Sequence, residues 1–145
     1  MALYFIRHAE TLGNVANLWV GRKDEGITKC KKTARGIATS QLKPPCVRVS
    51  ENLQERDFGR FEGEIKTDEH RKLLEQDPSV ESLTSIKSRL GEVMVEADSL
   101  PGDILLVSHS AVFRCLIENM HYVSIPERRS LDNLEYVRLV HKQIR

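Results

Sequence analysis

Two histidines follow the two most strand-like segments of the sequence. Arg7 and His8 come directly after the apolar run at residues 3–6, and His109 follows the run at residues 104–107 by one serine. The carboxyl ends of parallel strands meet at one edge of a sheet, which is where open α/β sheets bind ligands. A lone histidine there could simply hydrogen-bond to the core. Two in the same context, one beside an arginine, predict a shared crevice with a function.

Phosphoryl transfer is the chemistry that these residue types suit. Arg7 can hold a phosphoryl group through two parallel hydrogen bonds. A neutral imidazole can attack phosphorus and become a phosphohistidine, while a second, protonated imidazole stabilises charge on the transferring oxygens. A helix that begins at Ala111 would direct backbone N–H groups at the anion. A carboxyl group would complete the set as the acid that protonates the leaving alcohol.

The elements that would position these residues follow from hydrophobic patterning. Short apolar runs alternate with longer amphipathic segments, which predicts an α/β fold with three α/β/α layers and a mostly parallel sheet. Strands are expected at residues 3–6 and 104–107, more weakly around Val47 and Val49, and last at an edge within 134–140. Helices are expected at residues 28–41, 67–76, 78–98 and 111–120, with Asp77 and Ser110 as two of the caps.

Composition excludes several classes of protein. The chain has 145 residues and a net charge of +1, so we expect one domain over residues 1–145 and no binding of nucleic acid. No apolar run is long enough to cross a bilayer, so no membrane association is expected. Three cysteines and five histidines show no metal-binding spacing. The odd cysteine count is typical of reduced thiols, which predicts a cytoplasmic protein.

Five segments of the chain resemble, in order, the motifs of the histidine phosphatase superfamily, also called phosphoglycerate mutase-like. The family's RHGExxxN pattern matches at Arg7, His8, Glu10 and Asn14, with Ala9 in place of its glycine. Four further segments are similar to later motifs of the family: VGRKDEGIT at residues 20–28, LQERDFGRFEG at 53–63, DPSVESLTSIKSRL at 77–90 and LLVSHSAVFRCLI at 105–117. Together these segments cover nearly the whole chain.

The resemblance implies a role for each matching position. His8 would accept the phosphoryl group, Arg7 and His109 would flank it, and Glu55 would donate the proton to the leaving group. Residues implied to contact phosphate or substrate are Asn14, Gly21 and Ser110. Arg22 is a further candidate for substrate binding, and it could equally be a surface charge. Asp24 belongs to the same motif as Gly21. The family needs no metal or cofactor, so the resemblance implies a metal-independent phosphatase that acts on a small phosphorylated metabolite.

Several of these assignments have structural competitors. Glu55 could instead pair with Arg56 or Arg60 on the surface, and Asp57, Glu62 and Glu64 are weaker candidates for the acid. Packing is the expected role of Trp19, Phe58 and Cys115. Surface or packing roles are expected for the other histidines, which are His70, His121 and His141.

The sequence departs from the family between residues 41 and 53. The family carries a further strand and helix there, with an S-P-L-x-R-A motif whose arginine is a second phosphate clamp, and this chain has no such motif. We therefore expect one strand–helix unit fewer, with residues 46–50 pairing beside the strand at 104–107. Arg48, Arg22 and Arg114 are candidates to replace the arginine. Loss of that clamp would cost roughly two to three decades of rate.

Three functions are compatible with these motifs. A phosphatase is favoured over a phosphoglycerate-type mutase for two reasons. The stretch at 64–77 is short and has no clear clamp of basic residues, and Phe58 stands where the family's mutases have a tyrosine. A degenerate member that binds a phosphorylated ligand or protein without turnover is the alternative. A purely structural role is the third. An open sheet edge would also favour a homodimer that covers it.

Overall fold

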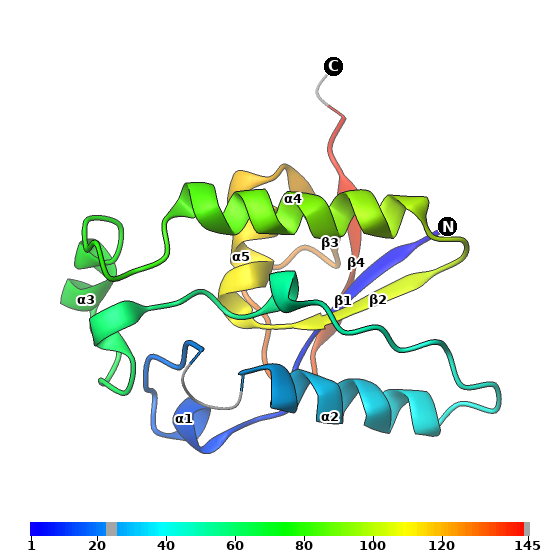
Figure 1. The fold of residues 1–145 in the computed structure, drawn as a ribbon, viewed down its shortest axis with the longest axis horizontal. Coiled ribbons are helices and arrows are strands. Elements are labelled where there is room, and N and C mark those ends of the chain that lie inside the picture. The colour runs from blue at the N-terminus through cyan, green and yellow to red at the C-terminus, as the bar shows by residue number, and fades with distance from the viewer. Residues whose placement is uncertain (23–25, 144–145) are drawn as a thin grey trace.

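A four-stranded sheet forms the centre of the protein in a computed structural model that describes residues 1–22 and 26–143. The strands are β1 (Leu3–Arg7), β2 (Ile104–Ser108), β3 (Tyr122–Ile125) and β4 (Tyr136–His141), in the spatial order β2-β1-β4-β3. β1 and β2 are parallel, as expected, and β4 runs antiparallel to both of its neighbours. Helices cover both faces, which confirms the three-layer α/β/α architecture (Figure 1).

Three longer helices make the outer layers. α2 (Gly26–Thr39) lies on one face of the sheet, and α4 (Leu83–Ser99) and α5 (Ser110–Asn119) lie on the other (Figure 1). The remaining elements are short: α1 (Leu12–Val15), α3 (Asp68–Leu73) and two single 3-10 turns, η1 (Glu51–Leu53) and η2 (Gly59–Phe61). Within residues 1–22 and 26–143, no helix combines the length and the apolar character needed to cross a membrane.

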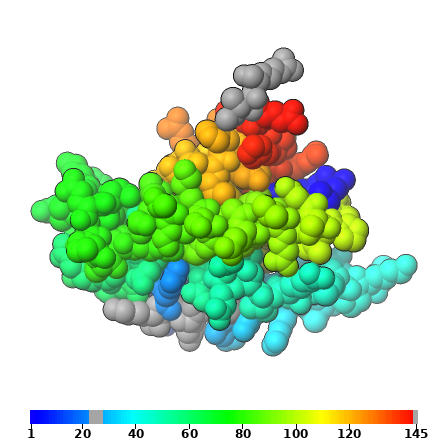
Figure 2. Space-filling view, turned by 45° about the horizontal axis from the view of Figure 1, so that its top comes forward, coloured from blue at the N-terminus to red at the C-terminus, as the bar shows by residue number. Residues whose placement is uncertain are grey.

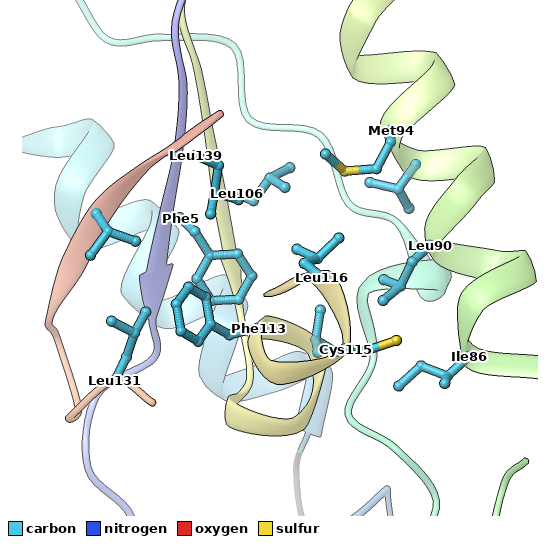
Figure 3. Packing of buried hydrophobic residues seen from close by; sticks show 13 residues of the cluster. Phe5, Ile86, Leu90, Met94, Leu106, Phe113, Cys115, Leu116, Leu131 and Leu139 are labelled. Carbon is cyan, nitrogen blue, oxygen red and sulfur yellow. The ribbon is translucent and has the colours of Figure 1, made fainter. Parts of the chain in front are cut away.

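The main hydrophobic core lies between the sheet and the α4–α5 layer. Phe5 of β1 and Phe113 of α5 pack with ring centroids 5.3 Å apart at its centre (Figure 3). α4 contributes side chains at three- and four-residue steps, which are Ile86, Leu90, Val93, Met94 and Ala97. A second, smaller cluster contains Trp19, Phe58, Phe61, Leu74 and Val80. The packing roles expected for Trp19, Phe58 and Cys115 are therefore confirmed.

Three of the longer helices begin at other residues than the sequence indicates, and α2, expected at 28–41, spans Gly26–Thr39. α4 begins at Leu83 because the side chain of Ser82 accepts the N–H of Ser85. The Asp77 carboxylate accepts the N–H of Ser79 instead, which closes a turn before the helix. α5 begins at Ser110, and His109 rather than Ser110 is its N-cap. The predicted helix at 67–76 is confirmed in its core, with Thr67 as the N-cap of α3.

The prediction of an edge position for the last strand was wrong. β4 pairs with β1 on one side and with β3 on the other, so the edge strands of the sheet are β3 and β2. β3 has only four residues and follows α5 after Met120 and His121. Its hydrophobic pattern therefore looks like a continuation of the helix, and only its pairing with β4 makes it a strand.

The expected pairing of residues 46–50 with β2 is absent from the structure. Residues 44–50, all described, form neither helix nor strand, and no backbone hydrogen bond joins them to β2. Pro44 and Pro45 lack an N–H for such a ladder. The Arg48 guanidinium lies 3.6 Å from the Glu96 carboxylate, which holds the segment toward α4. The connection passes outside the sheet, and its tip projects at the right of Figures 1 and 2.

Candidate active site

His8 and His109 lie against each other at the carboxyl ends of β1 and β2. The parallel register pairs Arg7 with Ser108, so the next residue on each strand is a histidine. The two imidazole rings meet edge to face with centroids 4.8 Å apart. Both side chains are buried, at 6% and 4% exposure. Two residues that are remote in the sequence therefore form one pair because adjacent strands end together.

His8 is held as a neutral imidazole with one free nitrogen. Its Nδ1 lies 2.6 Å from the carbonyl oxygen of Ala9. Because a carbonyl only accepts hydrogen bonds, Nδ1 carries the proton and Nε2 keeps its lone pair. Burial lowers the pKa of His8 to about 4, and the electrostatic interaction with the neighbouring His109 acts in the same direction. At neutral pH the side chain is therefore ready to act as a nucleophile.

Glu55 is the carboxyl group that belongs to this site. Its side chain is 6% exposed, and burial raises its pKa above the usual range. Two backbone N–H groups donate to it, from Arg56 at 2.9 Å and from Ala111 in the first turn of α5 at 3.3 Å. These two hydrogen bonds and the charge of Arg7 act in the opposite direction, and burial is the larger cause. A carboxyl with a raised pKa keeps its proton to higher pH, which suits a proton donor.

The competing surface pairs of Glu55 are not formed. The Arg56 guanidinium makes a bidentate pair with Glu75, at 2.8 and 3.2 Å. Arg60 pairs with Asp77. Among the weaker acid candidates, Glu62 accepts the N–H groups of Arg22 and Phe58 and so joins two loops.

A buried ion pair fixes the segment that carries Glu55. Arg89 of α4 donates to both carboxylate oxygens of Glu81, at 2.7 and 2.9 Å, and also to the backbone carbonyls of Asn52 and Gln54. The Ser108 hydroxyl donates to the carbonyl of Leu53 at 2.7 Å. α4 and β2 therefore hold the residues immediately before Glu55, which places the carboxyl beside the histidines.

The Arg7 guanidinium makes one hydrogen bond to the backbone and has a second, buried donor, its Nε. One terminal nitrogen donates to the carbonyl of Leu131 at 2.7 Å. Among the residues that the structure describes, Nε of Arg7 is buried and has no hydrogen-bond partner. A buried donor without a partner costs free energy unless a ligand satisfies it. The guanidinium of Arg7 thus offers a donor that an anion beside His8 could use.

Asn14 lies near His8 with its side-chain oxygen already in use. That oxygen accepts the N–H of Thr11 in a capping box at the start of α1, and also accepts the side chain of Asn133. Asn133 donates in addition to the backbone carbonyl of His8, at 2.9 Å. Asn133 was missed by the sequence analysis, since nothing in its local sequence links it to His8.

Gly21 and Arg22 contact the acid segment rather than the histidine pair. A Cβ atom at Gly21 would lie 1.8 Å from the Glu62 carboxylate, so a larger residue would displace that side chain from the N–H groups of Arg22 and Phe58. Arg22 points to Glu81, at 3.2 Å, and to the carbonyl of Glu55, at 3.3 Å. Asp24 lies outside the described residues. Ser110 is the first residue of α5, next to His109, although the N–H that reaches Glu55 belongs to Ala111.

The candidate replacements for the missing arginine are engaged elsewhere. Arg22 pairs with Glu81, Arg48 with Glu96, and Arg114 with Glu118 at 3.6 Å. Lys66 is a cation that the sequence analysis missed. Burial and the charge of Arg7 lower the pKa of Lys66, whereas the charge of Glu55 raises it. Lys66 therefore interacts electrostatically with two charged groups of the site. Its backbone N–H donates to Asn17, and its ammonium lies 5.4 Å from the Trp19 ring centroid.

α2 supports the site from the opposite face of the sheet. Its Thr33 hydroxyl accepts the N–H of Ala9 at 3.2 Å, and its Cys30 sulfur lies 3.3 Å from Nε2 of His109. Burial raises the pKa of Cys30 to about 12, so this side chain is a thiol at neutral pH. The described part of the chain contains no group of three or more His, Cys, Asp or Glu side chains arranged to hold a metal ion.

The sequence and the structure resemble known proteins. Residues 26–144 match the family model described as the histidine phosphatase superfamily (branch 1). A phosphoglycerate mutase structure from Thermus thermophilus is 22% identical, with a TM-score of 0.65 over 95% of this chain and 92% of that one. The alpha-ribazole phosphatase structure from Shigella flexneri is 20% identical, with a TM-score of 0.66 over 94% and 88%. At these identities the structures share the fold. No curated protein matches the sequence.

Proposed function

Because the chain belongs to the histidine phosphatase superfamily (branch 1), we propose that it hydrolyses phosphomonoesters through a phosphohistidine on His8. The observation that carries the proposal is the pairing of two buried groups with opposite tasks. His8 is neutral with its Nε2 lone pair available, and Glu55 has a pKa shifted toward the protonated form. A nucleophile and a proton donor are the two groups that the first step of ester hydrolysis needs.

In the first step, Nε2 of His8 attacks phosphorus while the bond from phosphorus to the ester oxygen breaks. Glu55 gives its proton to that oxygen, so the product leaves as a neutral alcohol. The unpartnered Nε of Arg7 donates to a phosphoryl oxygen. His109, packed against the His8 ring, stabilises the charge on the same group. His8 is phosphorylated and Glu55 is a carboxylate at the end of this step.

In the second step, the Glu55 carboxylate takes a proton from water while the water oxygen attacks phosphorus. The bond from phosphorus to Nε2 breaks, and inorganic phosphate leaves. Glu55 is again protonated and His8 again neutral, so both groups return to their starting state. The N–H groups of Arg56 and Ala111 stabilise the carboxylate between the two steps, because they donate to its two oxygens.

Hydrolysis of a generic aryl phosphate in the presence of EDTA tests this function. We expect turnover of p-nitrophenyl phosphate to continue with excess chelator, because every group in the proposed steps belongs to the protein. Vanadate, which resembles the phosphoryl group in transfer, should inhibit competitively. Activity that disappears with EDTA and returns with a divalent metal would contradict the proposal. Saturable vanadate binding without turnover would support the degenerate binding protein instead.

We propose further that Lys66 supplies part of the charge that the family's second arginine provides. Replacing Lys66 with methionine should lower kcat/KM for aryl phosphates by about 10- to 100-fold, the effect of losing one charge-assisted hydrogen bond. Lys66→Arg should retain most activity, because it keeps the charge. Lys72→Met, on the exposed part of α3, is the matched control and should leave kcat/KM unchanged. Equal kcat/KM values for Lys66→Met and the unaltered protein would contradict a role for Lys66 in phosphate binding.

A further inference from the structure

A cavity of about 670 Å³ lies beside the outer edge of β2. It is bounded by α2, by the C-terminal half of α4 and by the connection at residues 45–50. Small-molecule sites in proteins are typically about 300 to 1,000 Å³, so the volume is that of a ligand site. The cavity exists because the connection passes outside the sheet without pairing with β2, which leaves space between them. We call it the edge cavity.

The walls of the edge cavity are largely apolar. Each bounding segment contributes aliphatic side chains, including Ala34, Ile37, Val49, Leu53, Leu100 and Leu105. Some of these side chains are exposed, with 57% of Val49 and 39% of Leu105 accessible. Its charged lining groups carry both signs, and the Arg48–Glu96 pair neutralises one of each. The lining therefore favours an apolar group over an ionic one.

The edge cavity adjoins the catalytic centre at His109, which belongs to both. His109 and Cys30 line the cavity, and the His109 ring also packs against the His8 ring. Leu53 also lines it, two residues before Glu55, and its carbonyl accepts the Ser108 hydroxyl. A phosphoryl group held at the His8–His109 pair would therefore lie next to this apolar space.

We propose that the edge cavity binds the apolar part of the substrate, so that the preferred substrates are phosphomonoesters of long alkyl or aryl-alkyl alcohols. The proposal rests on the proposed function and specifies its substrate class. Burial of each added methylene group should raise kcat/KM about threefold until the cavity is filled. Small sugar or acid phosphates, which expose polar groups on every side, gain nothing from such walls.

A chain-length series tests the substrate class. kcat/KM is measured for the phosphomonoesters of ethanol, butanol, hexanol and octanol, below their micelle concentrations. We expect a rise of at least about 30-fold from ethyl to octyl. Two substitutions that fill the cavity, Ala34→Phe and Val49→Trp, should reduce the octyl-to-ethyl ratio toward one. Val49 lies on an exposed connection, so its variant tests the idea even if Ala34→Phe fails to fold. Val95→Phe is the matched control, because Val95 is 71% exposed on α4 and does not line the cavity.

A binding experiment separates failure of the cavity from failure of the hydrolysis. Alkylphosphonates cannot be hydrolysed, and their affinities are measured by calorimetry for the same chain lengths. Affinity that rises with chain length, and falls in Val49→Trp, supports the edge cavity even in the absence of turnover. Turnover with a flat chain-length profile overturns the cavity and leaves the hydrolase intact. A stable dimer in size-exclusion chromatography that binds no alkylphosphonate would also overturn it, because a second copy would then cover the edge.

Discussion

Replacing His8 with alanine is expected to lower the turnover of p-nitrophenyl phosphate by about 10⁴- to 10⁶-fold. Removing the nucleophile of a covalent mechanism costs nearly the whole of its rate advantage, because the other catalytic groups have no intermediate to act on. His8 is suited to this role by two features of its surroundings. The Ala9 carbonyl fixes the proton on Nδ1, and burial lowers the pKa to about 4. The loss should appear in kcat, while vanadate binding falls much less.

Isotope labelling gives the prediction a second readout. Substrate labelled with ³²P, quenched rapidly in alkali, should label the unaltered protein but not His8→Ala. His141→Ala is the matched control, since His141 lies on the exposed surface of β4 and has no role in the proposed steps. Label retained in His8→Ala, or full activity in that variant, would show that another residue is the nucleophile.

Replacing Glu55 with glutamine is expected to lower kcat/KM by about 10²- to 10⁴-fold for alkyl phosphates. The loss should be smaller for p-nitrophenyl phosphate, because nitrophenolate leaves without a proton. Glutamine keeps the size of the side chain but cannot donate an acidic proton or accept one from water. Glu127→Gln, an exposed carboxyl outside the site, is the control and should leave both substrates unaffected.

The dependence of the hydrolysis rate on pH should reflect the lowered pKa of His8 and the raised pKa of Glu55. His8 must be neutral, so the rate should fall as the pH drops through about 4. Glu55 must be protonated in the first step, so the rate should fall as the pH rises through its raised pKa. In Glu55→Gln the alkaline limb should disappear while the acid limb remains. An alkaline limb that persists in Glu55→Gln would show that another group donates the proton.

The parts of the site that could be predicted from sequence are those that local patterns encode. Two apolar runs, each ending close to a histidine, were enough to place His8 and His109 at one edge, because parallel strands in register end together. The position of Glu55 came from a resemblance in its surrounding motif and not from its charge. Its neighbours Arg56 and Arg60 would have been equally plausible partners in the sequence, and only the fold assigns them to Glu75 and Asp77.

The parts that could not be predicted depend on contacts between distant segments. Asn133 reaches the carbonyl of His8 across 125 positions, and the pairing of residues 17–19 with 63–66 fixes the backbone of Lys66. Val47 and Val49 alternate as a strand should, yet backbone pairing requires a neighbour in register. The Arg48–Glu96 contact and the two prolines hold that segment away from β2. The local sequence of each of these segments does not indicate which distant segment it contacts.

The orientation of the His8 and Glu55 side chains does not depend on hydrogen bonds from the connection at residues 45–50. The hydrogen bonds that orient the His8 ring and the Glu55 carboxyl come from Ala9, Arg56 and Ala111, none of which lies in it. Lengthening a flexible loop costs only about 0.6 kcal/mol for each doubling of its length. The outer side of β2 is therefore a point at which whole elements can be added or deleted while His8 and Glu55 keep their positions. What such an element changes is the set of side chains that surround the phosphoryl group and the rest of the substrate.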